Sequence, residues 1–331
     1  PPRRSSDLKN KDIQPQPMTG EGKLRFNWNT AMHESRLNPG TMYLGSQFLF
    51  KTVNKGETWQ RISPDLSTND PVKLNQEESG GLSVDNSSAE NHCTIFTLVE
   101  STFDENIIWA GTDDGNLQYT LNGGKNWTNV SKNYVASGIP AQTWVSSIEL
   151  SKFDKNVVYA TFDNHMYGDK NTYIAKSSDM GKTWTMFTSS NFTGFAHKIK
   201  EDNINKNLLF LGTELGLFAS VDGGSNWFRM KSHNLPGYAL VRDIKFHPQT
   251  NDLVLATQGR GIAIIDNITP MRTLTTDIAN KDVYLFPQPD MVLRNGVLGN
   301  GGFPLAGWVS DNAPDIIPVQ YYFKERISNE D

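Results

Sequence analysis

The sequence predicts an all-β protein built from β-propeller blades, each a sheet of four antiparallel strands. One short polar motif returns four times, at 52–59, 120–127, 177–184 and 220–227: Ser/Thr, any, Asp/Asn, any, Gly, any, Thr/Asn, Trp. The runs around each copy are rich in β-branched and aromatic residues and are separated by Gly, Asn and Asp, which indicates short strands. No segment sustains a 3.6-residue apolar period, so helix is expected to be minor.

The predicted strands group into successive repeats. Four repeats carry the motif between their third and fourth strands, at 26–63, 93–131, 144–189 and 196–231. A fifth, without the motif, covers 241–267, and 282–288 is predicted as its fourth strand. Such repeats are typical of propeller blades around a central axis. Because five blades are few for a closed ring, we expect about five blades of a larger propeller.

The motif predicts a self-contained hairpin turn. Its Asp or Asn side chain is expected to accept hydrogen bonds from turn amides, its Gly to adopt a positive φ, and its Trp to cover the turn. The pattern resembles the Asp-box, or bacterial neuraminidase (BNR) repeat, which implies a structural role. The residues concerned are Asn54, Gly56, Trp59, Asn122, Gly124, Trp127, Asp179, Gly181, Trp184, Asp222, Gly224 and Trp227.

A wider resemblance rests on 25–30, 49–67, 79–101, 107–130 and 253–272. These stretches look like secreted bacterial proteins described as sortilin-like or glycosyl hydrolase-like, similar in architecture to two-propeller xyloglucanases. The resemblance implies an N-terminal arm or crossover from a preceding blade at 1–23, blades at 24–290, and a linker with the first strand of a β-sandwich at 291–331. It also implies a missing N-terminal propeller portion as partner, on the same or a cleaved chain, and export to the periplasm, cell surface or medium.

Composition excludes several classes of function. The net charge is −5 without a long basic run, which argues against nucleic-acid binding. Cys93 is the only cysteine, so neither an internal disulfide nor a thiolate metal cluster is expected, and we predict a buried thiol in a strand. No stretch predicts a transmembrane segment, and no pattern indicates a metal or a cofactor.

Candidate site residues lie on the loops opposite the motif turns, where propellers commonly bind ligands. For catalysis we single out Glu90, Asp113 and Asp114. For ligand binding we single out Asp85, His92, Trp144, Asp163, His165, Tyr167 and Arg260, with His197, Glu214, Arg242 and Gln258 completing the face. Simpler structural roles are open for most of them: turn chemistry for the two aspartates, loop capping for Asp163, and pairing with a neighbouring carboxylate for Arg260.

Two classes of function therefore stay open. A binding module for a protein, peptide or glycan is favoured because no carboxylate pair stands out above turn chemistry. The alternative is a glycoside hydrolase, which needs two carboxylates about 5–5.5 Å or about 6.5–9.5 Å apart; Glu90 with Asp113 or Asp114 is the predicted pair. A sialidase is disfavoured, since the nearest match to its Arg-Ile-Pro segment, Arg61-Ile62-Ser63-Pro64, has a Ser inserted.

Overall fold

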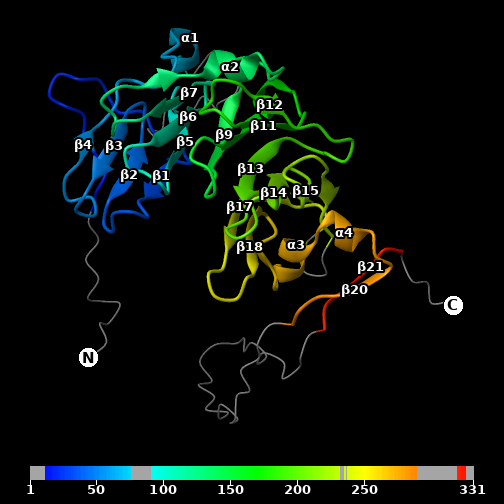
Figure 1. Cartoon of the computed structure of the whole chain (residues 1–331). Helices are drawn as coiled ribbons and strands as arrows, with labels where there is room; N and C mark the ends of the chain where they lie inside the picture. Colours follow the sequence, from blue (N-terminus) through cyan, green and yellow to red (C-terminus); the bar gives the residue numbers. More distant parts are fainter. Residues whose placement is uncertain (1–11, 76–90, 232–234, 236, 289–318, 326–331) are drawn as a thin grey trace, which may run out of the picture. The chain divides into compact units, whose positions relative to one another are not determined.

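The computed structural model describes residues 12–75, 91–231, 235, 237–288 and 319–325. It divides into two compact parts, Pro1–Asp266 and Asn267–Asp331, which we describe separately. Among its described residues, the first part is built from antiparallel sheets and short helical turns (Figure 1), as the sequence predicts. The described helices are too short and too polar to cross a bilayer.

Four sheets of the first part have four strands each, paired in sequence order. The strands are β1 Met32–Glu34, β2 Met42–Gly45, β3 Leu49–Thr52 and β4 Gln60–Arg61; β5 Ile95–Glu100, β6 Ile108–Thr112, β7 Leu117–Thr120 and β8 Thr128–Asn129; β9 Trp144–Leu150, β10 Val158–Asp163, β11 Tyr173–Ser177 and β12 Thr185–Met186; β13 Ala196–Glu201, β14 Leu209–Thr213, β15 Gly216–Ser220 and β16 Phe228–Arg229. A fifth sheet has three: β17 Leu240–Phe246, β18 Leu253–Gln258 and β19 Ile262–Ile265.

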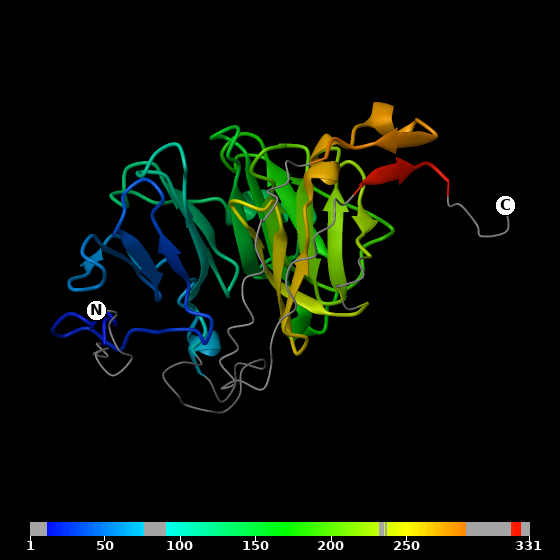
Figure 2. The ribbon, with the colours of Figure 1, turned by 90° about the horizontal axis from the view of Figure 1, so that it is seen from below.

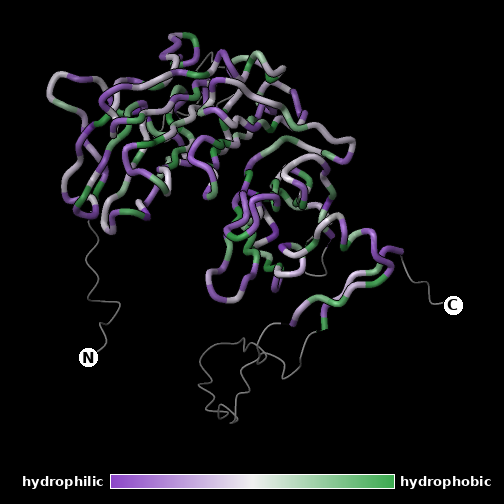
Figure 3. The backbone as a smooth tube through the Cα atoms, viewed as in Figure 1, coloured by the Kyte–Doolittle hydropathy of each residue, from purple (hydrophilic) through white to green (hydrophobic). Residues whose placement is uncertain are grey.

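Successive sheets pack face to face in chain order (Figure 2). The first strand of each sheet contacts the first strand of the next, from β1 through β5, β9 and β13 to β17. Second strands β6, β10 and β14 are buried along their whole length, which explains their unbroken apolar runs. Figure 3 shows the hydrophobic residues concentrated in these strands and the hydrophilic ones in the connections.

The four motif turns have the predicted geometry. In every copy the first-position hydroxyl donates to the third-position Asx oxygen and accepts the amide of the motif glycine, at 2.8 to 3.0 Å. The same Asx oxygen accepts the amide of the seventh residue at 2.9 or 3.0 Å. All four motif glycines have positive φ.

Two pairs of neighbouring sheets are joined by a buried glutamate. Glu100, the last residue of β5, accepts hydrogen bonds from Ser35 Oγ (2.6 Å) and Tyr43 Oη (2.8 Å) of the first sheet. Glu201, the last residue of β13, accepts from Ser151 Oγ, Lys152 N and Tyr159 Oη of the third sheet. We call each of these glutamates, with its donors, a carboxylate latch.

The second part contains α3 Thr269–Thr273, α4 Thr276–Ala279 and a sheet of two strands, β20 Val283–Leu285 and β21 Tyr321–Phe323. The sequence predicts 282–288 as the fourth strand of the fifth repeat, and this is wrong: Tyr284 is paired with Tyr322. The partner strand lies 36 or more residues downstream in the sequence, beyond the reach of a local repeat pattern. The predicted boundaries at 23/24 and 290/291 stay predictions.

Candidate functional site

The sheets place second-strand ends and first-strand starts at a common edge. Because the strands alternate in direction, the connections after second strands lie opposite the motif turns. We call this edge of sheets two to five the loop face. It is where the structure places His92, Trp144, Asp163, His165 and His197.

Asp113 is fully buried directly after β6. Its carboxylate accepts hydrogen bonds from Thr94 N (2.8 Å), Thr94 Oγ1 (2.6 Å) and Asn27 Nδ2 (3.2 Å). Burial raises the pKa of Asp113 to about 6. The carboxylate therefore joins three segments of the chain and is not exposed at the surface.

Asp114 is also fully buried. It accepts hydrogen bonds from Thr68 N and Thr68 Oγ1, both at 2.7 Å, and from Thr112 Oγ1. Both aspartates thus hold neighbouring segments together by hydrogen bonds, in line with the structural role that the sequence left open for them. Their predicted partner Glu90, and Asp85, lie outside the described residues.

His92 and Trp144 form the first half of the loop face. Their ring centroids are 5.7 Å apart, and Trp144 also packs on Phe96 at 5.3 Å. His92, 4% exposed, has Nε2 3.1 Å from the Asp113 carbonyl oxygen. A carbonyl only accepts, so His92 donates from Nε2, and the neutral ring keeps Nδ1 as an acceptor.

Both rings have an unsatisfied polar atom. Within the described part of the chain, neither His92 Nδ1 nor Trp144 Nε1 has a hydrogen-bond partner, although both atoms are buried. Buried polar atoms are rarely left unpaired in folded proteins, and each such atom calls for an explanation. An acceptor and a donor on adjacent rings match a hydroxyl group, which both donates and accepts.

Asp163, His165 and His197 form the second half. Asp163 Oδ1 accepts from the His165 amide (3.0 Å) and Nδ1 (2.6 Å), while Oδ2 lies 3.8 Å from His197 Nδ1. Burial raises the pKa of Asp163, partly offset by the bonds from His165. Burial, then the positive charge of Arg242, lowers the pKa of His197 to about 3. His197 is therefore neutral near pH 7, and its buried Nε2 has no partner among the described residues.

Aromatic surface adjoins this second half. The His165 ring stacks on Phe195 with centroids 4.2 Å apart, and Phe195 contacts His197 edge-on at 4.9 Å. Tyr167, on the 3-10 turn η2 His165–Tyr167, is 53% exposed. Our sequence reasoning missed Phe96 and Phe195; the position of each beside a first-strand start is the signal that identifies them.

Within the described residues, Arg260 makes no hydrogen bond or ion pair with this group. It is exposed in the β18–β19 turn, whereas Arg242 Nε donates to Gln258 Oε1 at 3.2 Å. Among the residues that the structure describes, no three His, Cys, Asp or Glu side chains are arranged to hold a metal ion.

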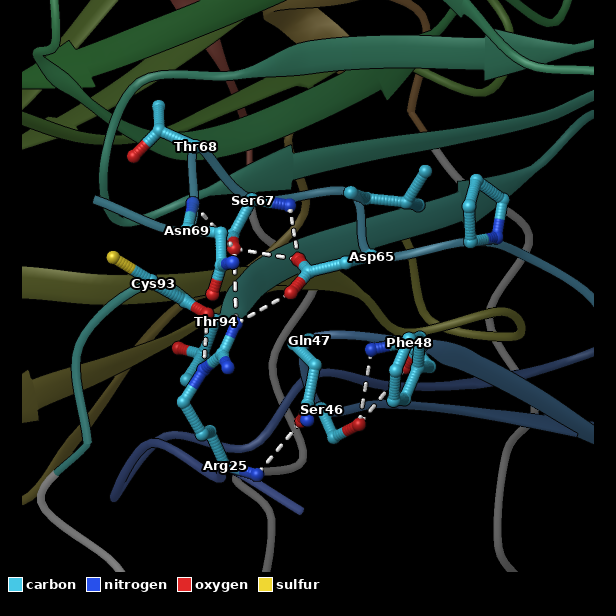
Figure 4. Close-up of polar contacts among 12 residues, drawn as sticks. Arg25, Ser46, Gln47, Phe48, Asp65, Ser67, Thr68, Asn69, Cys93 and Thr94 are labelled. Atoms are coloured by element: carbon cyan, nitrogen blue, oxygen red, sulfur yellow. Dashed lines mark hydrogen bonds and ion pairs between the residues drawn. The ribbon is translucent and has the colours of Figure 1, made fainter. Parts of the chain in front are cut away.

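Arg25 holds the backbone between His92 and Thr94 (Figure 4). Its guanidinium donates to Cys93 O (3.2 Å), Asp65 Oδ2 (2.7 Å) and Ser67 Oγ (3.1 Å). Cys93 has a φ of 58°, an uncommon backbone conformation for a side chain other than glycine. The thiol is buried, as predicted, but the predicted place in a strand is wrong, since β5 begins at Ile95. Burial raises the pKa of this thiol to about 12. The Arg25 contacts thereby help to orient His92.

Acid should destabilise the fold through His197. Above about pH 6.5 the ring is neutral in both the folded and the unfolded chain, and the contribution is complete. As pH falls below 6.5, His197 is protonated in the unfolded chain, whereas in the folded chain it is protonated only near pH 3. The free energy of unfolding therefore drops by up to about 1.4 kcal/mol per pH unit in this range. In urea unfolding at pH 4 to 6.5, His197→Gln should show a shallower pH slope than the wild type. Replacement of the exposed His247 by Gln is the control; equal slopes for both variants would contradict this role of His197.

Comparison with solved structures defines the architecture. An ancestral GH74 enzyme aligns with a TM-score of 0.50 and 18% identity, over 71% of this chain and 28% of that one. A GH74 xyloglucanase from Xanthomonas campestris gives 0.51 and 16%, over 72% and 36%. The fold is that of a β-propeller. This confirms the predicted fold class, and at such identities the likeness shows the fold alone.

A GH74 enzyme from Niastella koreensis aligns at a TM-score of 0.46 and 16% identity, over 73% of this chain and 47% of that one. The chain thus spans 28% to 47% of the length of these three proteins. No family model and no curated protein sequence matches the chain.

Proposed function

We propose that this propeller module binds a carbohydrate through its loop face, as part of a larger exported protein. The observation that carries the proposal is the buried pair of His92 Nδ1 and Trp144 Nε1, an acceptor and a donor without partners among the described residues. Sugars present hydroxyl groups, which can donate to an acceptor such as His92 Nδ1 and accept from a donor such as Trp144 Nε1. A ligand that does so removes the cost of two unpaired buried groups, about 1–3 kcal/mol each.

The rest of the face fits the same ligand class. Sugar rings have apolar faces that pack on aromatic side chains, which Trp144 and Tyr167 supply. Asp163 and Arg242 add a charged acceptor and a charged donor. Xyloglucan oligosaccharides are the first probe, because one structurally similar protein is a xyloglucanase.

Glycoside hydrolysis is the second candidate, favoured by the likeness to GH74 structures and by carboxylates on the loop face, among them Asp163 and Glu214. Asp163 is the candidate among them because it lies beside His165 and His197, although, like Asp113 and Asp114, it is buried and already hydrogen-bonded. A second carboxylate at a catalytic distance is required. Release of reducing sugar from xyloglucan that is abolished in Asp163→Asn would establish the enzyme.

Trp144→Phe should weaken glycan binding about tenfold, because it removes the indole donor and keeps an aromatic ring. Isothermal titration of wild type and variant with xyloglucan oligosaccharides measures the change. Trp28→Phe, the same substitution at a tryptophan that is 69% exposed, is the matched control. Equal affinities for all three proteins would exclude Trp144 from the site, and binding of a peptide with no glycan bound would favour a protein ligand.

A further inference from the structure

A contact between neighbouring sheets recurs at the motif glycines. The residue directly after the fourth strand of one sheet lies against the motif glycine of the next: Ile62 against Gly124, Val130 against Gly181, and Phe187 against Gly224. A Cβ built on each glycine would meet that residue at 2.2 to 3.3 Å. Each of these motif glycines therefore contacts the chain directly after the fourth strand of the preceding sheet.

The first sheet has the same contact, although no sheet precedes it among the described residues. Ile13 lies against Gly56, where a Cβ would meet it at 2.9 Å. Trp59 Nε1 donates to Ile13 O at 2.6 Å, just as Trp127 Nε1 donates to Ile62 O at 3.1 Å. Ile13 thus occupies the place of Ile62 with respect to the next motif turn.

The surrounding sequence supports this equivalence. Ile13-Gln14-Pro15 corresponds to Ile62-Ser63-Pro64. From Ile13 to the start of β1 the chain advances 19 residues, within the range of 9 to 33 found from Ile62 to β5 and from Phe187 to β13. The connection is therefore of the kind that joins one sheet to the next.

Ile62, Val130 and Phe187 each make a backbone hydrogen bond that Ile13 lacks among the described residues. The amides of Ile62, Val130 and Phe187 donate to a carbonyl at the start of the third strand in their own sheet, that of Leu49, Leu117 and Ile174 respectively, at 2.8 or 2.9 Å. No such backbone partner for the Ile13 amide is found within residues 12–75, 91–231, 237–288 and 319–325. A third strand that would accept this hydrogen bond has to come from elsewhere.

We propose that residues 12–15 end the fourth strand of a further four-stranded sheet of the same repeat, encoded upstream, which docks on the first sheet. A hollow of about 300 Å³ lies between this arm and the first sheet, lined by Phe50, Trp59 and Arg61. The fifth sheet is not the occupant, because β17 and β1 form no contact comparable to those between first strands of neighbouring sheets in the described chain.

Hydrogen exchange tests the proposal. The protein encoded by the whole reading frame that contains this sequence is expressed, and its amide exchange is compared with that of the 331-residue chain. The amide of Ile13 should exchange at least tenfold more slowly in the longer protein, and Ile13→Asp in the longer protein should remove that protection. The Ile62 amide, which is bonded in both proteins, is the internal control.

Three results would overturn the proposal. The first is an upstream sequence without a four-strand repeat. The second is equal exchange of the Ile13 amide in both proteins. The third is cross-linking of the arm to β19, in the same chain or in a second copy. Residues 12–15 would then be the fourth strand of the fifth sheet.

Discussion

Gly124→Ala is expected to lower the free energy of unfolding by about 3 kcal/mol. Gly124 has a φ of 98°, which costs a side-chain-bearing residue about 1–2 kcal/mol. A Cβ there would lie 2.2 Å from Ile62 O and 2.9 Å from Ile62 Cβ, so the fourth strand of the first sheet must move away. Such overpacking adds about 1–3 kcal/mol.

Gly123→Ala separates the two causes. Gly123 also has a positive φ, 67°, but a Cβ there meets only Asn106 Oδ1, at 3.2 Å. Urea unfolding of the two variants should show that Gly124→Ala is the less stable by about 1–3 kcal/mol. Equal losses would mean that the glycine serves the turn alone and that the close approach of sheets is unimportant.

The second large effect is expected at a carboxylate latch. Glu100→Ala leaves Ser35 Oγ and Tyr43 Oη buried without their acceptor and opens a cavity between two sheets. We expect a loss of about 3 kcal/mol in the free energy of unfolding. Chemical denaturation of the purified chain measures it.

Glu34→Ala is the matched control, because Glu34 ends β1 as Glu100 ends β5 but is exposed. Its loss should stay within about 0.5 kcal/mol. A double-mutant cycle of Glu100→Ala with Tyr43→Phe should give a coupling energy of about 1 kcal/mol or more. Additive losses would show that the hydrogen bond between them does not stabilise the sheet pair.

The fold was predictable because the residues that determine the turns and strands of each repeat lie close together in the sequence. The motif predicts a turn, and the apolar runs before it predict buried strands. The strands β2, β6, β10 and β14 therefore lie where the sequence predicts them. Fourth strands are shorter than predicted, two residues each, because only two residues pair with the third strand. Local patterns did not reveal the pairing of β20 with β21.

The site was predictable only in part. Alternating strand direction places His92, Trp144, Asp163 and His165 at one face, and this needs only the strand order. It does not reveal that Asp113 and Asp114 point inward. That depends on Thr94, Thr68 and Asn27, which lie 19, 46 and 86 residues from the aspartates that they bond.

The central claim, a carbohydrate site at His92 and Trp144, is tested most directly by the indole N–H resonance of Trp144. Titration with xyloglucan oligosaccharides, followed by a wider glycan panel, should shift this resonance saturably, and its exchange with water should slow as the N–H gains an acceptor. The His92 ring resonances should move at the same midpoint. An unchanged Trp144 resonance while a glycan binds elsewhere, or a shift produced by peptides and by no glycan, would contradict the claim.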